Sequence, residues 1–252
     1  MNYIIIDKSC MSAFTDNINA DDHKHWMLQL FFALENDLII NIAGKEIKCI
    51  CIVVNTDIKH SFSAQNKPIF SMLIDAISPL ALGLKETYLH SKNYHIFDNN
   101  RIVEMQGDAL FKESITIKSY ENFVFSLFEA MNIKICSNDG YHERIHKVIE
   151  QLKICDCLDH AINEIADNIF ISPSRLSHHF KEQTGMPLKS YILLHMVKRA
   201  YLHLLQNGNI TNAALEAGFD SPSHFAATSK KLTGMSASNI SKDSVFLKAE
   251  YI

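Results

Sequence analysis

Residues 170–186 read FISPSRLSHHFKEQTGM, and residues 219–235 read FDSPSHFAATSKKLTGM. The two stretches follow one pattern, displaced by 49 residues without a gap. Identical residues occupy eight positions, which in the first stretch are Phe170, Ser172, Pro173, Ser174, Lys181, Thr184, Gly185 and Met186. A repeat of this kind predicts that one structural unit occurs twice in the C-terminal part of the chain.

Each stretch predicts a helix with clear start and stop signals. Ser172 and Ser221 are favourable N-cap residues, and each is followed by a proline, whose missing N–H costs nothing in the first helical turn. Gly185 and Gly234 can adopt the left-handed conformation that ends a helix. We therefore expect two helices of roughly 12 residues.

A short segment with helical spacing of apolar residues precedes each of these helices, at 161–167 and at 211–217. A tight turn separates the segment from the serine, and Gly218 lies in the second turn. Helix, tight turn and a second helix with small polar residues at its start is the helix-turn-helix pattern. Two copies in register make the pattern far more specific than one.

Residues 188–206 predict an amphipathic helix that connects the two units. Its apolar positions are Leu188, Tyr191, Ile192, Leu194, Val197, Tyr201, Leu204 and Leu205, and its other face carries Lys189, His195, Lys198, Arg199 and His203. A helix of this length spans roughly 28 Å. Because neighbouring major grooves on one face of B-DNA lie roughly 34 Å apart, we expect the partner to be DNA rather than a protein.

Charge is distributed unevenly along the chain, whose formal net charge is −4. Residues 1–140 hold 12 basic and 17 acidic residues, whereas residues 141–252 hold 12 basic and 11 acidic residues and eight of the 13 histidines. The C-terminal part is therefore the candidate for binding a polyanion.

These residues resemble the AraC/XylS family of bacterial regulators over about residues 142–241. The matching positions are 165–166, 172–176, 180–181 and 184–186 in the first unit, and 217–219, 221, 223–225, 230 and 234–236 in the second. The resemblance implies two helix-turn-helix units joined by a long helix in a transcriptional regulator. The chain departs from the family pattern at Ala227 and Ser229, where arginine and phenylalanine are usual, and at Ala237, where proline is usual.

The resemblance also implies which residues contact DNA. In the first unit the base-reading positions fall on Ser174, Ser177 and His178, with Arg175 beside them. In the second they fall on Pro222, Ser223, Ala226 and Ala227, of which only Ser223 has a side chain that hydrogen-bonds to a base edge. We therefore expect the first unit to read sequence.

The second unit is expected mainly to contact phosphates, through Lys230 and Lys231. Lys181, Lys189, Lys198 and Arg199 are either further phosphate ligands or ordinary surface charges. Leu176, Phe180, Phe219 and Phe225 are expected in the core.

The N-terminal part predicts strands, so that with the C-terminal helices the whole chain is expected to have an α+β architecture. Short apolar segments in residues 27–77, separated by polar turns such as Ala43-Gly44-Lys45, favour antiparallel strands in a barrel or sandwich. The family resemblance implies a cupin-like barrel with helices here, commonly one that binds a small effector. We expect residues 1–136 to form this sensor or dimerisation domain, 137–141 a linker that includes Ser137, Asn138 and Asp139, and 142–252 the DNA-binding domain.

Three histidines in this part, His23, His25 and His60, resemble the metal-binding positions of cupin barrels. Three interpretations stay open: a metal site, the lining of an effector pocket, or structural histidines. Catalytic cupins usually place a glutamate where this chain has Gln29, so the sequence favours neither a metal nor another cofactor.

An apolar stripe follows at Tyr120, Phe123, Val124, Leu127, Phe128 and Met131, which recur with helical spacing. The stripe either packs on its own barrel or forms the contact of a homodimer, as repeated DNA half-sites would favour.

Taken together, the sequence predicts a non-enzymatic regulator that binds double-stranded DNA as a homodimer, with a small-molecule effector and RNA polymerase as further candidate partners. A metal-dependent cupin enzyme with an accessory helical domain is the alternative. With six cysteines lacking a metal-binding spacing, no recognisable signal peptide and no apolar run near 18 residues, we expect a cytoplasmic protein with reduced thiols and no membrane segment.

Overall fold

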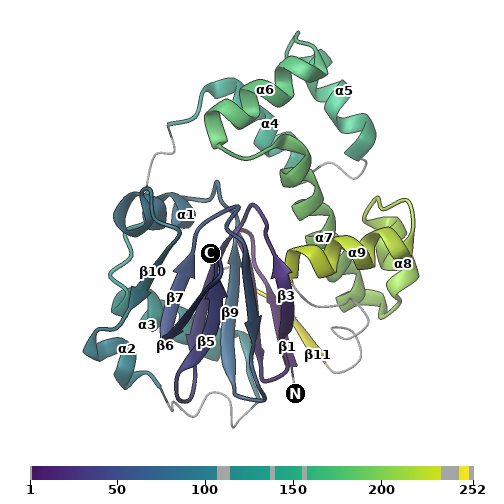
Figure 1. The fold of residues 1–252 in the computed structure, drawn as a ribbon. Helices are drawn as coiled ribbons and strands as arrows, with labels where there is room; N and C mark the ends of the chain where they lie inside the picture. The colour runs from purple at the N-terminus through teal and green to yellow at the C-terminus, as the bar shows by residue number, and fades with distance from the viewer. Residues whose placement is uncertain (1, 107–113, 137–139, 155–157, 234–243, 250–252) are drawn as a thin grey trace. The chain divides into compact units, whose positions relative to one another are not determined.

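The computed structural model describes residues 2–106, 114–136, 140–154, 158–233 and 244–249 (Figure 1). The chain divides into two compact units, one formed by Met1–Ser137 with Lys230–Ile252 and the other by Asn138–Ser229. Residues 137–139 of the predicted linker lie outside the described residues. None of the helices in the described part of the chain combines the length and the apolar character needed to cross a membrane.

The first unit contains a seven-stranded sheet in the order β10-β7-β4-β9-β2-β1-β11. Its strands are β1 (Asn2–Ile6), β2 (Cys10–Thr15), β4 (Leu28–Ala33), β7 (Cys51–Val54), β9 (Ile69–Ile74), β10 (Tyr94–Phe97) and β11 (Ser244–Lys248). The pairings are antiparallel except for that of β1 with β11, which is parallel. The C-terminal strand therefore pairs with the N-terminal strand, which the predicted domain boundary of 142–252 did not anticipate.

A second sheet of four strands has the order β3-β8-β5-β6. Its strands are β3 (Asn19–His23), β5 (Leu38–Ile42), β6 (Lys45–Cys49) and β8 (His60–Ser63). Ala43 and Gly44 join β5 to β6 with φ angles of 51° and 82°, the positive values that a two-residue hairpin turn requires. The predicted antiparallel strands are thus confirmed.

Of the barrel or sandwich that the sequence predicts, the described strands form two separate sheets, since no pairing among them joins one sheet to the other. Phe31 of the larger sheet packs against Phe62 of the smaller one, with 4.7 Å between ring centroids. The apolar run 46–54 is divided at Ile50, so that β6 lies in one sheet and β7 in the other. Apolar side chains between two facing sheets fill the core without a closed ladder.

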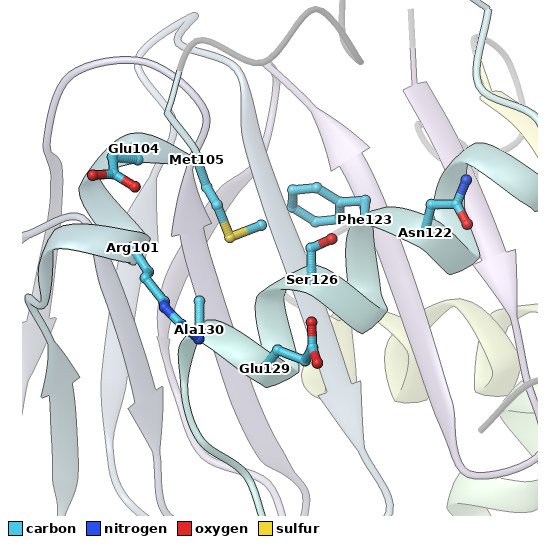
Figure 2. A pocket seen from close by; sticks show the side chains of 8 residues that line it. All are labelled: Arg101, Glu104, Met105, Asn122, Phe123, Ser126, Glu129 and Ala130. Carbon is cyan, nitrogen blue, oxygen red and sulfur yellow. The ribbon is translucent and has the colours of Figure 1, made fainter.

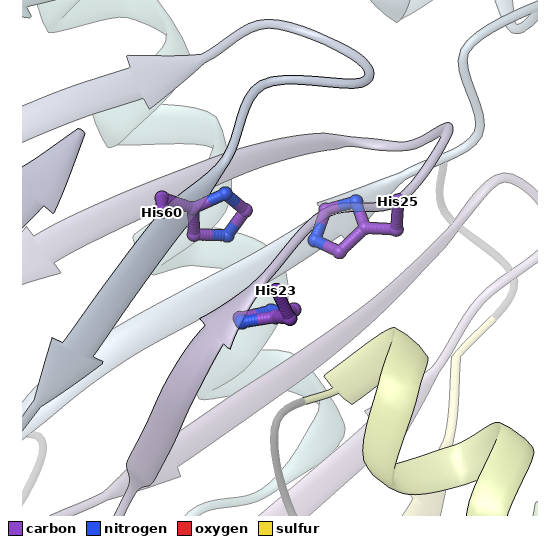
Figure 3. Close-up of side chains that lie close together, drawn as sticks. All are labelled: His23, His25 and His60. Carbon is purple, nitrogen blue, oxygen red and sulfur yellow. The ribbon is translucent and has the colours of Figure 1, made fainter. Parts of the chain in front are cut away.

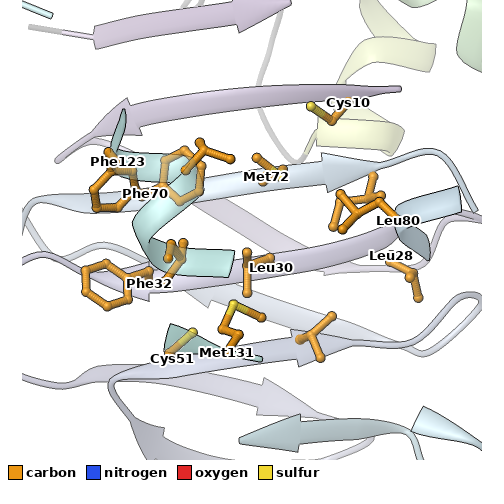
Figure 4. Packing of buried hydrophobic residues seen from close by; sticks show 14 of the residues in the cluster. Cys10, Leu28, Leu30, Phe32, Cys51, Phe70, Met72, Leu80, Phe123 and Met131 are labelled. Carbon is orange, nitrogen blue, oxygen red and sulfur yellow. The ribbon is translucent and has the colours of Figure 1, made fainter. Parts of the chain in front are cut away.

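The helices of the first unit are α1 (Pro79–Leu84), α2 (Asn100–Glu104) and α3 (Ile117–Ala130), and a π-helical turn spans Lys85–Leu89. Helix α3 packs on the larger sheet (Figure 4). Phe123 lies within 5.8 Å of the rings of Phe14, Phe32 and Phe70, measured between ring centroids, and these three come from β2, β4 and β9.

The apolar stripe of α3 and Met131 faces this core. Tyr120, Phe123, Val124, Leu127 and Met131 are buried, and Phe128 packs against the same cluster. The dimer interpretation of this stripe is therefore corrected, because side chains that cover their own sheet cannot also form a free surface.

The second unit contains only helices among its described residues: α4 (Glu143–Ile154), α5 (Leu158–Asn168), α6 (Pro173–Thr184), α7 (Leu188–Asn207), α8 (Ile210–Glu216) and the start of α9 (Pro222–Thr233). The 20-residue helix α7 agrees closely with the predicted connecting helix. It packs against both halves of the unit through two buried tyrosines. Tyr191 contacts Phe180 of α6, and Tyr201 contacts Phe225 of α9.

Candidate nucleic-acid interface

Helix α6 begins and ends where the sequence predicts. The Ser172 hydroxyl accepts a hydrogen bond from the Arg175 backbone N–H at 3.3 Å, and Pro173 occupies the first helical position. Gly185 adopts φ 72°, and its N–H donates to the Lys181 carbonyl at 2.8 Å. These two ends fix the first and last residues of the helix.

The inward face of α6 is held by Leu176 and Phe180, both fully buried as predicted. The outward face presents the five residues that the sequence singled out: Ser174, Arg175, Ser177, His178 and Lys181, all exposed. The polar side chains on this face therefore remain accessible to a partner.

The interactions on the outward face of α6 are local and weak. The Arg175 guanidinium donates to His179 at 3.4 Å, and the Ser177 hydroxyl donates to the Pro173 carbonyl at 3.0 Å. His178 lies 3.9 Å from a Glu182 carboxylate oxygen, with its side chain 79% exposed. Such contacts are easily exchanged for contacts with a ligand.

Helix α9, like α6, begins at a capping serine and has a buried aromatic residue. The Ser221 hydroxyl accepts a hydrogen bond from the His224 backbone N–H at 3.1 Å, and Phe225 is fully buried against Phe219. Ser223, His224 and Ala227 are exposed, and Ala226 is half-buried. The predicted cap at Gly234 and the departure at Ala237 lie outside the described residues.

The two lysines near the end of α9, Lys230 and Lys231, are exposed. The Lys230 ammonium lies 3.9 Å from an Asp21 carboxylate oxygen, and both side chains are largely open to solvent. An ion pair between exposed groups at this distance contributes little stability, so it competes poorly with a phosphate.

His224 was not among the residues that sequence reasoning selected for DNA contact. It occupies the same place in the second stretch as Arg175 does in the first, and its imidazole lies 3.1 Å from the Asp220 carboxylate. The repeat itself was the signal that could have found it.

The turns before α6 and α9 differ in length, although the two sequences align without a gap. In the first, the backbone N–H groups of Ile169, Phe170 and Ile171 donate to Ile165, Asp167 and Ala166. In the second, the N–H groups of Ala217, Gly218 and Phe219 donate to Ala213, Leu215 and Ala214. The structural equivalents before the serine are therefore displaced by 48 residues, so the second turn is one residue longer.

This displacement pairs Phe170 with Gly218, and both have positive φ, 58° and 88°. The side chain of Phe170 is 93% exposed, whereas Phe219, its partner in the sequence alignment, is buried. The Ile171 N–H donates to Ala166 as the Phe219 N–H donates to Ala214, so Ile171 is the structural equivalent of Phe219. Identity between Phe170 and Phe219 thus does not reflect a shared position in the fold.

The basic residues of α7 differ in exposure. Lys189 is exposed, whereas Lys198 and Arg199 are half-buried, so Lys198 and Arg199 are weaker candidates for phosphate contact than the sequence suggested. On the same helix the Tyr201 hydroxyl lies 2.6 Å from the Ser229 hydroxyl in a buried contact with α9.

The first unit holds a second group of candidate residues, in which the rings of His23, His25 and His60 converge (Figure 3). Their ring centroids lie 4.4–5.5 Å apart. His25 and His60 are buried, and burial lowers the pKa of His25 to about 3 and that of His60 to about 4. Both imidazoles are therefore neutral at physiological pH.

A pocket of about 390 Å³ lies elsewhere in this unit, between α2 and α3 (Figure 2). Met105, Phe123 and Ala130 supply apolar lining, and Arg101 with Glu129 supplies charge. Mixed lining of this kind suits a small amphipathic molecule. The sequence did not predict this pocket, because its walls come from two helices that are separated in the chain.

Residues 165–243 match the family model described as a helix-turn-helix domain. A stretch of 140 residues is also 27% identical to the arabinose operon regulatory protein of Escherichia coli, covering 53% of this chain and 46% of that protein. The chain therefore carries a helix-turn-helix domain. It spans about half the length of this curated relative.

Solved structures are similar over nearly the whole chain, beyond the helix-turn-helix domain. Apo ToxT from Vibrio cholerae strain SCE256, as a point variant, superimposes with a TM-score of 0.54 at 14% identity, covering 96% of this chain and 95% of that one. The wild-type protein of the same strain, bound to an unsaturated fatty acid, gives 0.50 at 13% identity, covering 95% and 93%. At these identities the comparison concerns the fold, an N-terminal sheet unit followed by helix-turn-helix units.

The structure accounts for one of the two departures from the family pattern within α9. Ser229, where the family usually has phenylalanine, is fully buried and meets the Tyr201 hydroxyl. Tyr201 therefore supplies from α7 the aromatic bulk that α9 lacks. Ala227 is exposed and leaves the outward face of α9 without a guanidinium.

Proposed function

We propose that the chain is a sequence-specific DNA-binding transcriptional regulator in which α6 reads bases and α9 mainly contacts phosphates. The exposed polar face of α6 carries this proposal. Arg175 and His178 reach outward from a helix that begins at Ser172 and whose opposite face is buried at Phe180. Guanidinium and imidazole groups hydrogen-bond to base edges in the major groove.

Helix α9 offers fewer groups of this kind, since Ser223 and His224 are its exposed hydrogen-bonding side chains before Lys230. Lysines are point charges that suit phosphate oxygens, so Lys230 and Lys231 are proposed as positioning contacts. Such contacts hold the protein on the duplex without selecting a sequence.

We propose that the N-terminal unit regulates this binding. The pocket between α2 and α3 supports an effector site, and the fatty acid bound by ToxT is a precedent for a ligand in a protein of similar fold. Homodimerisation and contact with RNA polymerase are further predictions. The regulatory role of the relative from Escherichia coli favours regulation over the alternative of a metal-dependent enzyme.

Selection of bound duplexes from genomic fragments by the full chain tests the proposal. We expect enrichment of a common sequence and an affinity that falls steeply with salt, because bound lysine and arginine release counterions. The control is the Arg175→Ala, His178→Ala double variant, which should retain its fold and lose the enrichment. Failure to bind any duplex at low salt, or equal affinity for selected and scrambled duplexes, would contradict the proposal.

A further inference from the structure

The three converging histidines come from different parts of the N-terminal unit. His23 ends β3 and pairs in register with His60 at the start of β8, while His25 follows β3 in the chain. One ring nitrogen from each can be chosen so that all three lie within 4.8 Å of one another. Gln29 on β4 reaches the same place, with its Oε1 2.9 Å from His60 Nε2 and 3.0 Å from His25 Nε2.

The hydrogen bonds of two rings determine where their protons lie. His23 Nδ1 is 2.7 Å from the Asp21 carbonyl, and His60 Nδ1 is 2.8 Å from the Ile58 carbonyl. Because a carbonyl only accepts, each Nδ1 must carry the proton. In a neutral ring Nε2 then carries a lone pair.

These lone pairs do not meet donors. His60 Nε2 faces Gln29 Oε1, which is also an acceptor, and the Gln29 amide N–H₂ donates instead to the Ser71 hydroxyl at 3.3 Å. His23 Nε2 is buried and has no hydrogen-bond partner among the described residues. A cluster of buried acceptors without donors is costly unless a cation satisfies them.

His25 is the one ring of the three whose tautomer is open, because its Nδ1 lies 3.2 Å from the Met27 carbonyl and 3.4 Å from the Met27 backbone nitrogen. It can therefore donate to Gln29 Oε1. That hydrogen bond would give Gln29 Oε1 a donor. The Nε2 lone pairs of His23 and His60 would still face no donor.

A rotated Gln29 amide is the competing explanation. With its oxygen and nitrogen exchanged, the amide would donate to His25 and His60 and accept from Ser71. This arrangement requires no ion, but it still leaves the buried His23 Nε2 without a donor.

We propose that His23, His25 and His60 bind one divalent transition-metal ion through their ring nitrogens, with Gln29 Oε1 as a fourth ligand. Neutral imidazole is a preferred ligand of Zn²⁺, Ni²⁺ and Fe²⁺, and Zn–N distances are about 2.0–2.1 Å. Nitrogens that already lie within 4.8 Å of one another need only small movements to reach such a centre.

The spacing also limits what can bind. Three rings with centroids 4.4–5.5 Å apart leave room between their nitrogens for a single atom rather than an organic effector. The carbonyls of Asp21 and Ile58 hold two of the rings from behind, as outer partners commonly hold metal-bound histidines. This site goes beyond the proposed function and would exist whether or not the chain binds DNA.

Titration of the full chain, without a polyhistidine tag, with Zn²⁺ against a competing chelator tests the site. We expect one tightly bound ion, and we expect His23→Ala to weaken its binding by more than roughly 100-fold, beyond the effect typical of an outer partner. His23 is the variant of choice because its ring is only half-buried, and circular dichroism checks that the fold is retained. His178→Ala is the matched control, since it removes the other described histidine group, His178, His179 and Glu182 of α6.

A second readout does not depend on affinity. The visible absorption of bound Co²⁺ is compared between the wild type and the Gln29→Glu variant. A carboxylate in place of the amide oxygen should keep or tighten binding and change the visible absorption of bound Co²⁺. Two results would overturn the proposal: no stoichiometric ion in the wild-type chain, or equal binding by the wild type and His23→Ala. The rotated amide would then explain the cluster, and DNA binding would be unaffected.

Discussion

The two helix-turn-helix units of the second domain share a framework and differ in what they expose. In both, a serine caps the second helix and a buried phenylalanine, Phe180 or Phe225, contacts a tyrosine of α7. At equivalent positions of the outward faces, Arg175 corresponds to His224, and His178 to Ala227. The comparison teaches that the packing of such a unit can be kept while the hydrogen-bonding side chains on its outward face change.

The comparison also extends to the turns. Phe170 and Gly218 both adopt positive φ, although the first has a Cβ and the second does not. A left-handed conformation costs a residue with a Cβ roughly 1–2 kcal/mol. The first unit therefore carries strain that the second avoids.

The largest expected effect is on DNA affinity, when a side chain is removed from the outward face of α6 or α9. Arg175→Ala should weaken binding to a selected duplex by about 1–3 kcal/mol, roughly 5- to 150-fold, because a guanidinium that reads a base edge is lost. The equivalent change His224→Ala should cost less. Fluorescence anisotropy with the same duplex measures both, and a larger loss for His224→Ala would reverse the roles assigned to the two units.

The next effect concerns the turns and is measured by urea denaturation. Phe170→Gly should raise the free energy of unfolding by up to about 1 kcal/mol, and Gly218→Ala should lower it by about 1–2 kcal/mol, because each change removes or adds a Cβ at positive φ. Phe170→Ala is the control, since it removes the exposed ring and keeps the Cβ. If Phe170→Gly destabilises the protein, the ring has a packing role that its exposure does not suggest.

A smaller effect tests the contact that the second unit makes with α7. Tyr201→Phe should lower the free energy of unfolding by about 1 kcal/mol, because the buried hydroxyl of Ser229 loses a hydrogen-bond partner. A double-mutant cycle with Ser229→Ala isolates the pair, and a coupling near zero would show that the contact does not stabilise α9.

The smallest effect separates phosphate contact from base reading. Lys230→Ala and Lys231→Ala should each reduce the slope of log affinity against log salt by about 1, with no change in sequence preference. Measurements at several salt concentrations on selected and scrambled duplexes check this. A change in preference would indicate instead that the end of α9 reads bases.

The sequence was sufficient for features that depend on neighbouring residues. Ser172 and Pro173 start α6, Gly185 ends it, and the apolar spacing of 188–206 produces α7, because caps and helical periodicity act within a few residues. The outward positions of Arg175 and His178 on α6 were implied by the family resemblance. Local signals thus determined where these helices begin and end, and the resemblance indicated which of their residues face outward.

Only the tertiary structure decided features that join distant parts of the chain. The pairing of β11 with β1, the division of 46–54 between two sheets and the burial of the α3 stripe depend on partners far away in sequence. The one-residue difference between the turns was hidden because Phe170 and Phe219 are identical in the alignment but do not occupy the same position in the fold. Gln29, which argued against a metal in the sequence, meets His60 only through strand pairing, because proximity in a sheet is set by register and not by sequence distance.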